Sequence, residues 1–231
     1  MKKVFLTGGA GFIGSAIVRQ LLTSGYQVTV YDNLYTGIME NLPDEKAVRF
    51  VLGDVENSDT VSSALKGHEY VIHLAAKAFI PDCYHFPKSV CLTNALGSLS
   101  VFAACQKQGV ERIVHVSSSE VYGSAMYTPM DEGHPLNPRS TYAVSKLAAD
   151  LWAQTMAIEH DLPAVIVRPF NVFGPRDTCP RFIPEMIRQC LKDDAIKTGN
   201  LNTYRDYTYV DDVARAIVLA LEKEKIDGEI V

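Results

Sequence analysis

Thr7-Gly8-Gly9-Ala10-Gly11-Phe12-Ile13-Gly14 is the stretch that decides the fold. It follows an apolar run from residue 2 to residue 7, which predicts a strand, and it leads into a helical pattern that ends near residue 25. Gly9, Gly11 and Gly14 satisfy G-x-G-x-x-G, and counting from Gly8 gives G-x-x-G-x-x-G. Glycine permits a tight turn here and lets backbone N–H groups approach a pyrophosphate at the helix N-terminus.

A second apolar run, residues 27–31, predicts a second strand, and it ends in Asp32. An acidic residue about 20 positions after such glycines, at a strand end, accepts a hydrogen bond from a ribose 2′-OH. The same carboxylate repels a 2′-phosphate, so the pattern favours NAD over NADP. Strand, glycines, helix, strand and acid in this order predict a dinucleotide-binding unit.

Strands and helices continue to alternate along the chain. This spacing predicts right-handed βαβ units, hence an α/β protein with a Rossmann-type, doubly wound parallel sheet, in which ligands bind at the carboxyl ends of the strands. The further predicted strands are 48–52, 70–76, 112–116 and 164–168, and the further predicted helices start near 57 or 58 and cover 90–108, 142–160, 180–192 and 210–222.

The ends of the third and fourth strands carry two further signals. Asp54 follows the third strand, where it is suited equally to contact adenine or to cap the next helix, for which Asn57 and Ser58 are also candidates. Leu74-Ala75-Ala76 lacks bulk, so a cofactor could lie across this strand end. His73 is predicted to be a packed core residue, because no other His, Cys or acid shows metal-site spacing with it.

Ser117 to Gly123 and the pair Tyr142 and Lys146 supply the candidate chemistry. The first segment follows the strand 112–116, and the pair lies at i and i+4 of a predicted helix, on one face. A hydroxyl, a phenol and an ammonium can therefore converge at the strand ends. A nearby cation favours a phenolate, so Lys146 is expected to lower the pKa of Tyr142 and make it a general base. The competing interpretation is a solvated Tyr–Lys pair on a helix surface.

Composition limits the function classes. The chain has 231 residues and a formal net charge of −5, which argues against a nucleic-acid binder. Five cysteines without a C-x-x-C pair indicate a reduced, cytoplasmic protein. Glycines and an arginine interrupt the N-terminal apolar run, so we expect no signal peptide. No stretch is expected to reach the ~18 apolar residues of a membrane span, so we predict a soluble protein without a membrane partner.

With these pieces in order, the whole chain resembles the extended short-chain dehydrogenase/reductase family, specifically its nucleotide-sugar epimerases and dehydratases. The resemblance rests on eight segments: 7–14, 32–34, 53–55, 73–76, 117–123, Tyr142-x-x-x-Lys146, Arg168-Pro169-Phe170-Asn171 and 205–212. It implies NAD as cofactor and a homodimer through helices 90–108 and 142–160. It also implies NAD contacts from a set of residues: Gly8, Gly11, Phe12, Ile13, Gly14, Asp32, Asn33, Asp54, Val55, Leu74, Ala75, Ala76, Asn94, Tyr142 and Lys146.

The resemblance also implies roles in a shared first step. Ser118 bonds the sugar O4, Tyr142 takes the O4 proton while hydride leaves C4, and Lys146 holds the ribose hydroxyls and stabilises the phenolate. The product is a bound 4-keto sugar. An epimerase such as a UDP-glucose 4-epimerase then returns the hydride to the other face of C4, whereas a 4,6-dehydratase removes the C5 proton, expels the C6 hydroxyl and delivers the hydride to C6.

Glu120 favours the dehydratase. In similar dehydratases an acid two residues before the Tyr-Gly pair abstracts the C5 proton, and ordinary 4-epimerases usually lack it; a solvated loop acid is the alternative. Ser119 stands where the thymidine-diphosphate sugar dehydratases have Asp, which leaves the proton donor for the leaving hydroxyl unassigned. The Ser-Ser-Glu run is closer to the guanosine- and uridine-diphosphate dehydratases and to UDP-glucuronate decarboxylases.

The C-terminal part of the chain is expected to bind the nucleotide-diphosphate sugar, whether UDP-, GDP- or dTDP-linked. The resemblance divides the chain into an NAD-binding domain, 1–170, and a partial substrate region, 171–231, interleaved with the sheet. Residues 228–231 look like the start of another strand, and family members generally continue further, so we expect a small, incomplete substrate lobe. A non-catalytic NAD-binding relative remains an alternative. The substrate-binding candidates are Ser118, Ser119, Asn171, Arg176, Arg181 and Arg205, with pairing to acids the alternative for Arg176 and Arg181.

Overall fold

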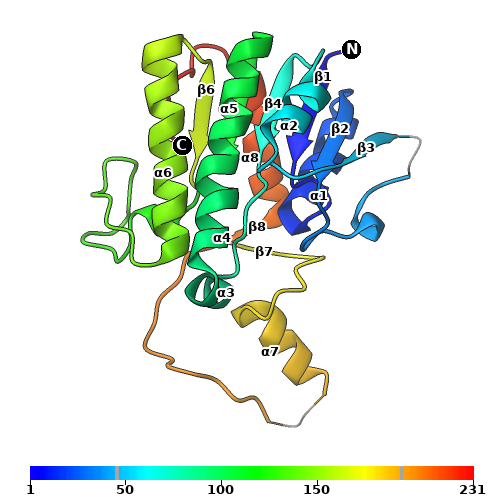
Figure 1. Cartoon of the computed structure of the whole chain (residues 1–231). Coiled ribbons are helices and arrows are strands. Elements are labelled where there is room, and N and C mark those ends of the chain that lie inside the picture. Colours follow the sequence, from blue (N-terminus) through cyan, green and yellow to red (C-terminus); the bar gives the residue numbers. More distant parts are fainter. Residues whose placement is uncertain (45–46, 193–194) are drawn as a thin grey trace.

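A six-stranded parallel sheet forms the centre of the computed structural model, which describes residues 1–44, 47–192 and 195–231. The strand order is β3-β2-β1-β4-β5-β6 (Figure 1). The chain runs outward from β1 to one edge and then returns to build the other half from β4, so the order reverses between β1 and β4, where open parallel sheets bind ligands. The strands are β1 (Lys3–Thr7), β2 (Gln27–Asp32), β3 (Val48–Leu52), β4 (Tyr70–His73), β5 (Arg112–Val116) and β6 (Ala164–Val167).

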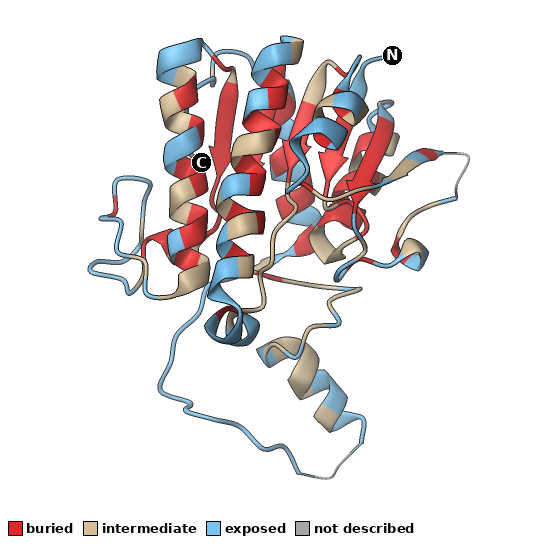
Figure 2. Ribbon diagram, in the orientation of Figure 1, coloured by how far each residue is buried: buried red, intermediate tan, exposed pale blue. Residues whose placement is uncertain are grey.

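Helices cover both faces of the sheet and bury it between them (Figure 2). Alternate residues of β1 show why: Val4 and Leu6 enter one core, whereas Phe5 enters the other. The first core includes α1 (Phe12–Thr23) and α8 (Val210–Glu222). The second includes residues of α2 (Ser58–Leu65), α5 (Gly97–Gln108) and α6 (Thr141–His160).

One continuous helical segment, residues 87–108, joins α4 (Pro87–Cys91), a π-helical turn (Leu92–Leu96) and α5. By length and composition it meets the criterion for a membrane span, contrary to the expectation from sequence, and half of that window is buried inside the fold. Core helices of globular proteins meet the same criterion. The segment packs against α2 and α6, as a core helix does.

The regular elements predicted from sequence are confirmed, but several short ones were missed. These are α3 (Ile80–His85) and a separate parallel pair, β7 (Asn171–Phe173) and β8 (Tyr207–Tyr209). The helix predicted over 180–192 is α7 (Phe182–Cys190), which lies apart from the main sheet (Figure 1). Ile230 bridges Ile166 in the parallel sense, so residues 228–231 do begin to pair along β6.

Candidate functional site

The backbone of the glycine turn is packed so closely that several of its positions have no space for a side chain. A Cβ on Gly14 would lie 2.1 Å from the carbonyl oxygen of Gly8, and Gly8 itself has a φ of +75° with the Ala75 backbone close by. Gly11 caps α1 without a side-chain hydrogen bond, and no acid lies in the first turn. The N–H groups of this helix start therefore face the cavity without a competing carboxylate, which suits the pyrophosphate of NAD.

Asp32 ends β2 beside this turn and is nearly buried. Its carboxylate accepts hydrogen bonds from Ala10 N at 3.0 Å and from Leu34 N at 2.8 Å, which fix its orientation. Burial raises the pKa of Asp32, and these two backbone bonds oppose the rise. The carboxylate lines the cavity, as an acceptor for a ribose hydroxyl must.

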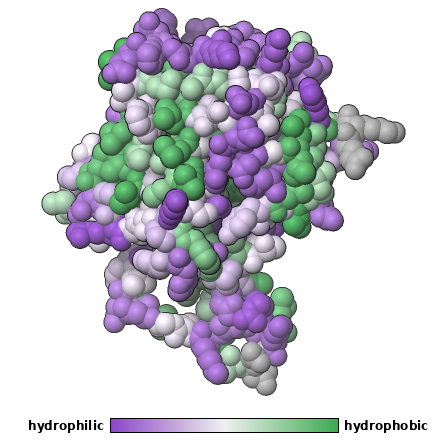
Figure 3. Space-filling view, viewed as in Figure 1, coloured by the Kyte–Doolittle hydropathy of each residue, from purple (hydrophilic) through white to green (hydrophobic). Residues whose placement is uncertain are grey.

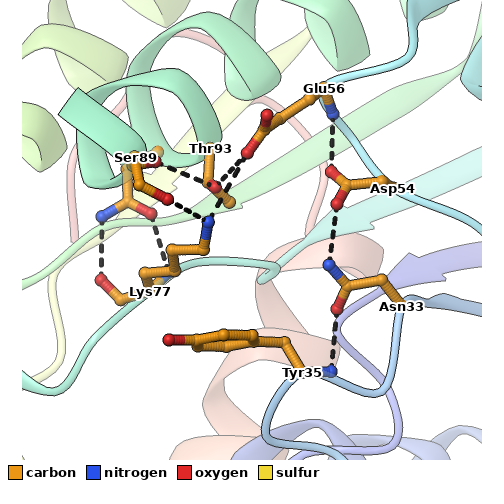
Figure 4. Close-up of polar contacts among 8 residues, drawn as sticks. Asn33, Tyr35, Asp54, Glu56, Lys77, Ser89 and Thr93 are labelled. Atoms are coloured by element: carbon orange, nitrogen blue, oxygen red, sulfur yellow. Dashed lines mark hydrogen bonds and ion pairs between the residues drawn. The ribbon is translucent and has the colours of Figure 1, made fainter. Parts of the chain in front are cut away.

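Asp54 does not cap the next helix but bonds to the neighbouring loops (Figure 4). Its carboxylate accepts from Asn33 Nδ2 at 2.8 Å and from Glu56 N at 2.9 Å, and Asp54 is not among the residues that line the cavity. Asn57 caps α2 by accepting from Thr60 N, so the cap interpretation of Asp54 is wrong. Asp54 instead holds the loops after β2 and β3 together.

Lys77, which the sequence reasoning missed, lies just past the small residues that follow β4. Its ammonium donates to Ser89 Oγ at 2.6 Å, lies 3.7 Å from Glu56 Oε1, and sits 5.2 Å from the ring centroid of Tyr35 (Figure 4). Lys77 and Tyr35 both line the cavity. The signal for Lys77 was its position, because it follows a strand at the ligand-binding edge of the sheet.

Asn94 supports this region from the π-helical turn. Its Oδ1 accepts from Lys77 N at 2.8 Å, and its Nδ2 donates to Lys77 O and to Ser145 Oγ, each at 3.0 Å. Asn94 is fully buried and does not line the cavity. It therefore connects the loop after β4 to α6, one residue before Lys146.

A single cavity of about 650 Å³ joins the glycine turn to the Ser118 and Tyr142 region. Three candidates fall outside its lining: Asp54, Asn94 and Ser119. The predicted residues that it brings together are Gly8, Gly11, Phe12, Ile13, Gly14, Asp32, Asn33, Val55, Leu74, Ala75, Ala76, Ser118, Glu120, Tyr142, Lys146, Asn171, Arg176, Arg181 and Arg205.

Ser118 and Glu120 are held by a short 3-10 turn at the end of β5. Ser118 is its N-cap, with Oγ accepting from Glu120 N at 3.2 Å, and Ser119 N donates to Pro169 O at 3.0 Å. Glu120 is half-buried and lines the cavity, so it is not a fully solvated loop acid. The turn thus presents a hydroxyl and a carboxylate to the same space.

Tyr142 differs from the expectation in the direction of its pKa. Burial raises the pKa above its ordinary value, while a hydrogen bond with Ser118 and the charge of Arg181 oppose the rise. Lys146 does not supply the expected lowering, because its ammonium donates to Val116 O at 2.6 Å. A further positive charge near Tyr142 would favour its phenolate form.

Lys146 is almost completely buried, with 2% of its surface exposed. Burial lowers its pKa to about 8, and the charge of Asp150 works in the opposite direction. His73 is confirmed as a core residue: its ring contacts Thr7 Oγ1 at 2.7 Å and Ser98 Oγ at 2.8 Å, and burial lowers its pKa to about 3. No cluster with metal-site composition occurs among the described residues.

The three arginines predicted to bind substrate all line the cavity, but they differ in their present contacts. Arg176 donates to Ser15 Oγ at 3.0 Å, and the exposed Arg205 donates to the neighbouring carbonyl of Tyr204. Arg181 lies 3.7 Å from the buried carboxylate of Asp177. Pairing with an acid is thus seen for Arg181, and not for Arg176, within the described part of the chain.

Comparison with known proteins gives one consistent result. The model of the NAD dependent epimerase/dehydratase family matches residues 4–231. A dTDP-glucose 4,6-dehydratase from Streptomyces niveus is 35% identical over 95% of this chain and 68% of its own length. A putative UDP-glucose 4-epimerase from Methanocaldococcus jannaschii is 36% identical over 94% of this chain and 73% of its own.

A solved structure agrees with these relatives. The dTDP-glucose 4,6-dehydratase DesIV from Streptomyces venezuelae, with NAD bound, has a TM-score of 0.93 at 34% identity, and the match covers 99% of this chain and 74% of that one. The chain spans about two thirds of the length of the dehydratase relatives, with 68% for one and 65% for another.

Proposed function

Because the chain belongs to the NAD dependent epimerase/dehydratase family, we propose that it oxidises a nucleotide-diphosphate sugar at C4 and converts the 4-keto sugar by 4,6-dehydration. One observation carries the proposal: Ser118, Glu120 and Tyr142 line the same cavity as the glycine turn. A hydroxyl, a carboxylate and a phenol are then available beside the cofactor groove.

The groups for holding NAD are in place along this groove. The free N–H groups at the start of α1 suit the pyrophosphate, Asp32 suits the adenosine ribose, and Lys146 suits the second ribose. Bound NAD would supply a hydride acceptor for C4 and a positively charged ring, which favours the phenolate form of a nearby tyrosine. This charge would oppose the burial that raises the pKa of Tyr142.

Tyr142 and Ser118 act on the sugar O4. The phenolate of Tyr142 takes the O4 proton as the C4 hydrogen leaves with its electron pair, and Ser118 Oγ holds O4 in place by a hydrogen bond. Lys146 keeps its ammonium beside the β5 end, where it bonds Val116 O and lies within reach of a ribose hydroxyl of the bound cofactor in this proposal. These residues account for the oxidation, which dehydratases and epimerases share.

Glu120 determines the fate of the 4-keto sugar. The 4-keto group acidifies the C5 hydrogen, and Glu120 removes it as the C6 hydroxyl departs, so the proton and the hydroxide leave together as water. Ser119 cannot supply the acid that an Asp would supply at this position, and it does not line the cavity. Glu120 therefore also delivers its new proton to the leaving hydroxyl in this proposal. The hydride taken from C4 would then return to C6, and a solvent-derived proton would add at C5, which gives the 4-keto-6-deoxy sugar and regenerates NAD.

Residues 171–231 would provide the nucleotide-diphosphate side. Asn171, Arg176, Arg181 and Arg205 line the cavity beyond the catalytic residues, and guanidinium groups suit phosphate oxygens. Asn171 begins β7, Arg176 and Arg181 follow β7, and Arg205 lies shortly before β8. The pairing of β7 with β8 brings these distant segments together.

A UDP-sugar 4-epimerase is the second candidate, because epimerases and dehydratases match the chain at similar identity. In that reaction Glu120 has no essential role, and the hydride returns to C4. The two reactions differ in whether the C5 hydrogen exchanges with solvent.

Incubation with UDP-, GDP- and dTDP-hexoses in D₂O, with added NAD, separates them. Deuterium at C5 in a 4-keto-6-deoxy product supports the dehydratase. Inversion at C4 without solvent deuterium supports the epimerase and overturns the dehydratase. Retention of NAD without conversion of any sugar would indicate a non-catalytic NAD-binding protein.

Glu120→Gln tests the assigned base. The variant should form the 4-keto species but yield at least ~100-fold less 6-deoxy product, since an amide cannot take the C5 proton. Glu132→Gln, at an exposed acid of the following loop, is the matched control. Unchanged dehydration by the Glu120 variant would remove the residue from the mechanism.

We also propose that α6 contributes to a homodimer. Val144, Leu151 and Ile158 recur every seven residues on its outer side, with 52%, 49% and 83% of their surfaces exposed. Apolar side chains are visible on the face formed by α5 and α6 in Figure 3. Leu151→Glu should convert the dimer to a monomer in sedimentation, whereas Leu219→Glu on α8 should not. A wild-type protein that stays monomeric at all concentrations would contradict the proposal.

A further inference from the structure

Asp150 lies one helical turn after Lys146, on the helix that also carries Tyr142. It is completely buried, and its Oδ2 accepts from Arg168 Nε at 2.8 Å. Arg168 directly follows β6 and is 5% exposed. A buried ion pair thus connects α6 to the end of the last strand of the sheet.

The same guanidinium reaches the loop that carries the other catalytic candidates. Arg168 Nη1 donates to the phenol oxygen of Tyr122 at 3.0 Å, and its central carbon lies 5.0 Å from the ring centroid of Tyr122. Tyr122 is buried and comes two residues after Glu120 and four after Ser118. One planar group therefore contacts both structural elements of the site at fixed angles.

Stability alone is a weak explanation for this arrangement. A buried ion pair contributes little net stability, and apolar residues of similar volume often replace one without loss. The backbone already attaches the loop to β6, because Ser117 N donates to Val167 O at 2.7 Å and Ser119 N to Pro169 O at 3.0 Å. What the side chains add is a direct connection from this loop to α6.

We propose that Asp150, Arg168 and Tyr122 form a positioning clamp that fixes Ser118 and Glu120 relative to Tyr142. None of these three residues lines the cavity, so the clamp acts through the residues that do. Its effect on turnover rests on the proposed function, because Ser118 and Glu120 must meet C4 and C5 of the same sugar. Small displacements of such groups cost rate, while substrate binding changes little.

Tyr122→Phe removes one bond of the clamp and leaves the ring in place. The expected result is a kcat about tenfold lower with KM within twofold of the wild type, and faster amide hydrogen exchange at residues 118–122. Tyr127→Phe is the matched control, because it removes an exposed phenol of the same loop, which donates to Asp131 at 2.8 Å and does not contact Arg168 among the described residues. This control should keep both kcat and exchange at wild-type values.

Arg168→Lys is the second variant, since it keeps the charge but cannot donate along two fixed directions. It should show the same loss of kcat with unchanged NAD affinity. A kcat within twofold of the Tyr127→Phe control in both variants would overturn the clamp, as would a loss explained entirely by a smaller folded fraction. If the wild type converts no nucleotide sugar, the proposed function fails, but amide hydrogen exchange still tests the clamp. Unchanged exchange at residues 118–122 in Tyr122→Phe overturns the clamp, and faster exchange supports it.

Discussion

Replacing Lys146 by Met is expected to stabilise the cofactor-free protein at neutral pH. Burial lowers the pKa of Lys146 from 10.5 to about 8, so at pH 7 the folded state holds a charge that the unfolded state solvates better. At about 1.4 kcal/mol per pH unit, this difference corresponds to roughly 3 kcal/mol. Loss of the hydrogen bond to Val116 O costs about 1 kcal/mol of stability. The expected net increase in the free energy of unfolding is therefore about 2 kcal/mol.

The pH dependence gives the prediction its sign. Between pH 8 and 10.5 the unfolded chain binds a proton at Lys146 that the folded protein has released, so the free energy of unfolding rises with pH in this window. The wild type should gain about 1.5 kcal/mol from pH 8 to pH 9.5, and Lys146→Met should gain none from this source. The measurement ends at pH 9.5 because burial raises the pKa of Tyr142 in the folded state, so ionisation of this tyrosine in the unfolded chain near pH 10 acts in the opposite direction.

Urea denaturation followed by the fluorescence of Trp152, the single tryptophan, measures both effects. Lys107→Met, at an exposed lysine of α5, is the matched control and should keep the wild-type slope. The reasoning would be refuted if the free energies of unfolding of the wild type and Lys146→Met changed in parallel with pH. Parallel here means within about 0.5 kcal/mol, which is on the order of the experimental error. Lys146→Met should nevertheless lose C4 oxidation, because the ammonium proposed to hold the second ribose of NAD is gone.

Three further outcomes are expected. Gly14→Ala should weaken NAD binding at least ~10-fold and lower the free energy of unfolding by about 2 kcal/mol, because its Cβ would lie 2.1 Å from a backbone oxygen. Gly199→Ala, where a Cβ meets nothing within 4 Å, should change neither quantity. Calorimetry measures both NAD binding and stability. Asp32→Asn should reduce the preference for NAD over NADP about tenfold in paired binding titrations; an unchanged ratio would exclude a contact to the ribose. Tyr142→Phe should slow C4 oxidation at least ~100-fold in single-turnover absorbance, with NAD affinity retained.

The parts of the fold that the sequence predicted are those fixed by local rules. The glycine turn and Asp32 could be placed because the turn needs residues without a side chain and the acid ends a regular strand. The pairing of β7 with β8 could not, since each has three residues and they lie 36 positions apart along the chain, Asn171 opposite Tyr207. Nothing in so short a segment specifies its partner.

The candidate site shows the same division. Ser118 and Tyr142 were predicted from strand ends and helix spacing, and both line one cavity. The direction of the pKa of Tyr142 was wrong, because it depends on burial and on where the Lys146 ammonium points, and neither can be deduced from an i, i+4 spacing. The hydrogen bond between Asp54 and Asn33 could not be predicted for a similar reason, since the two residues come from different loops.

The π-helical turn at Leu92–Leu96 makes this region sensitive to length rather than to composition. Such a turn accommodates one residue more than a regular helix would, and it aims Asn94 at both Lys77 and Ser145. Deleting one residue here would rotate everything on one side of the turn by about 100° and swing the Asn94 amide away from both neighbours. Substitutions at the exposed Leu96 should be tolerated, whereas a single-codon deletion in the same turn should separate the cofactor loop from the catalytic helix.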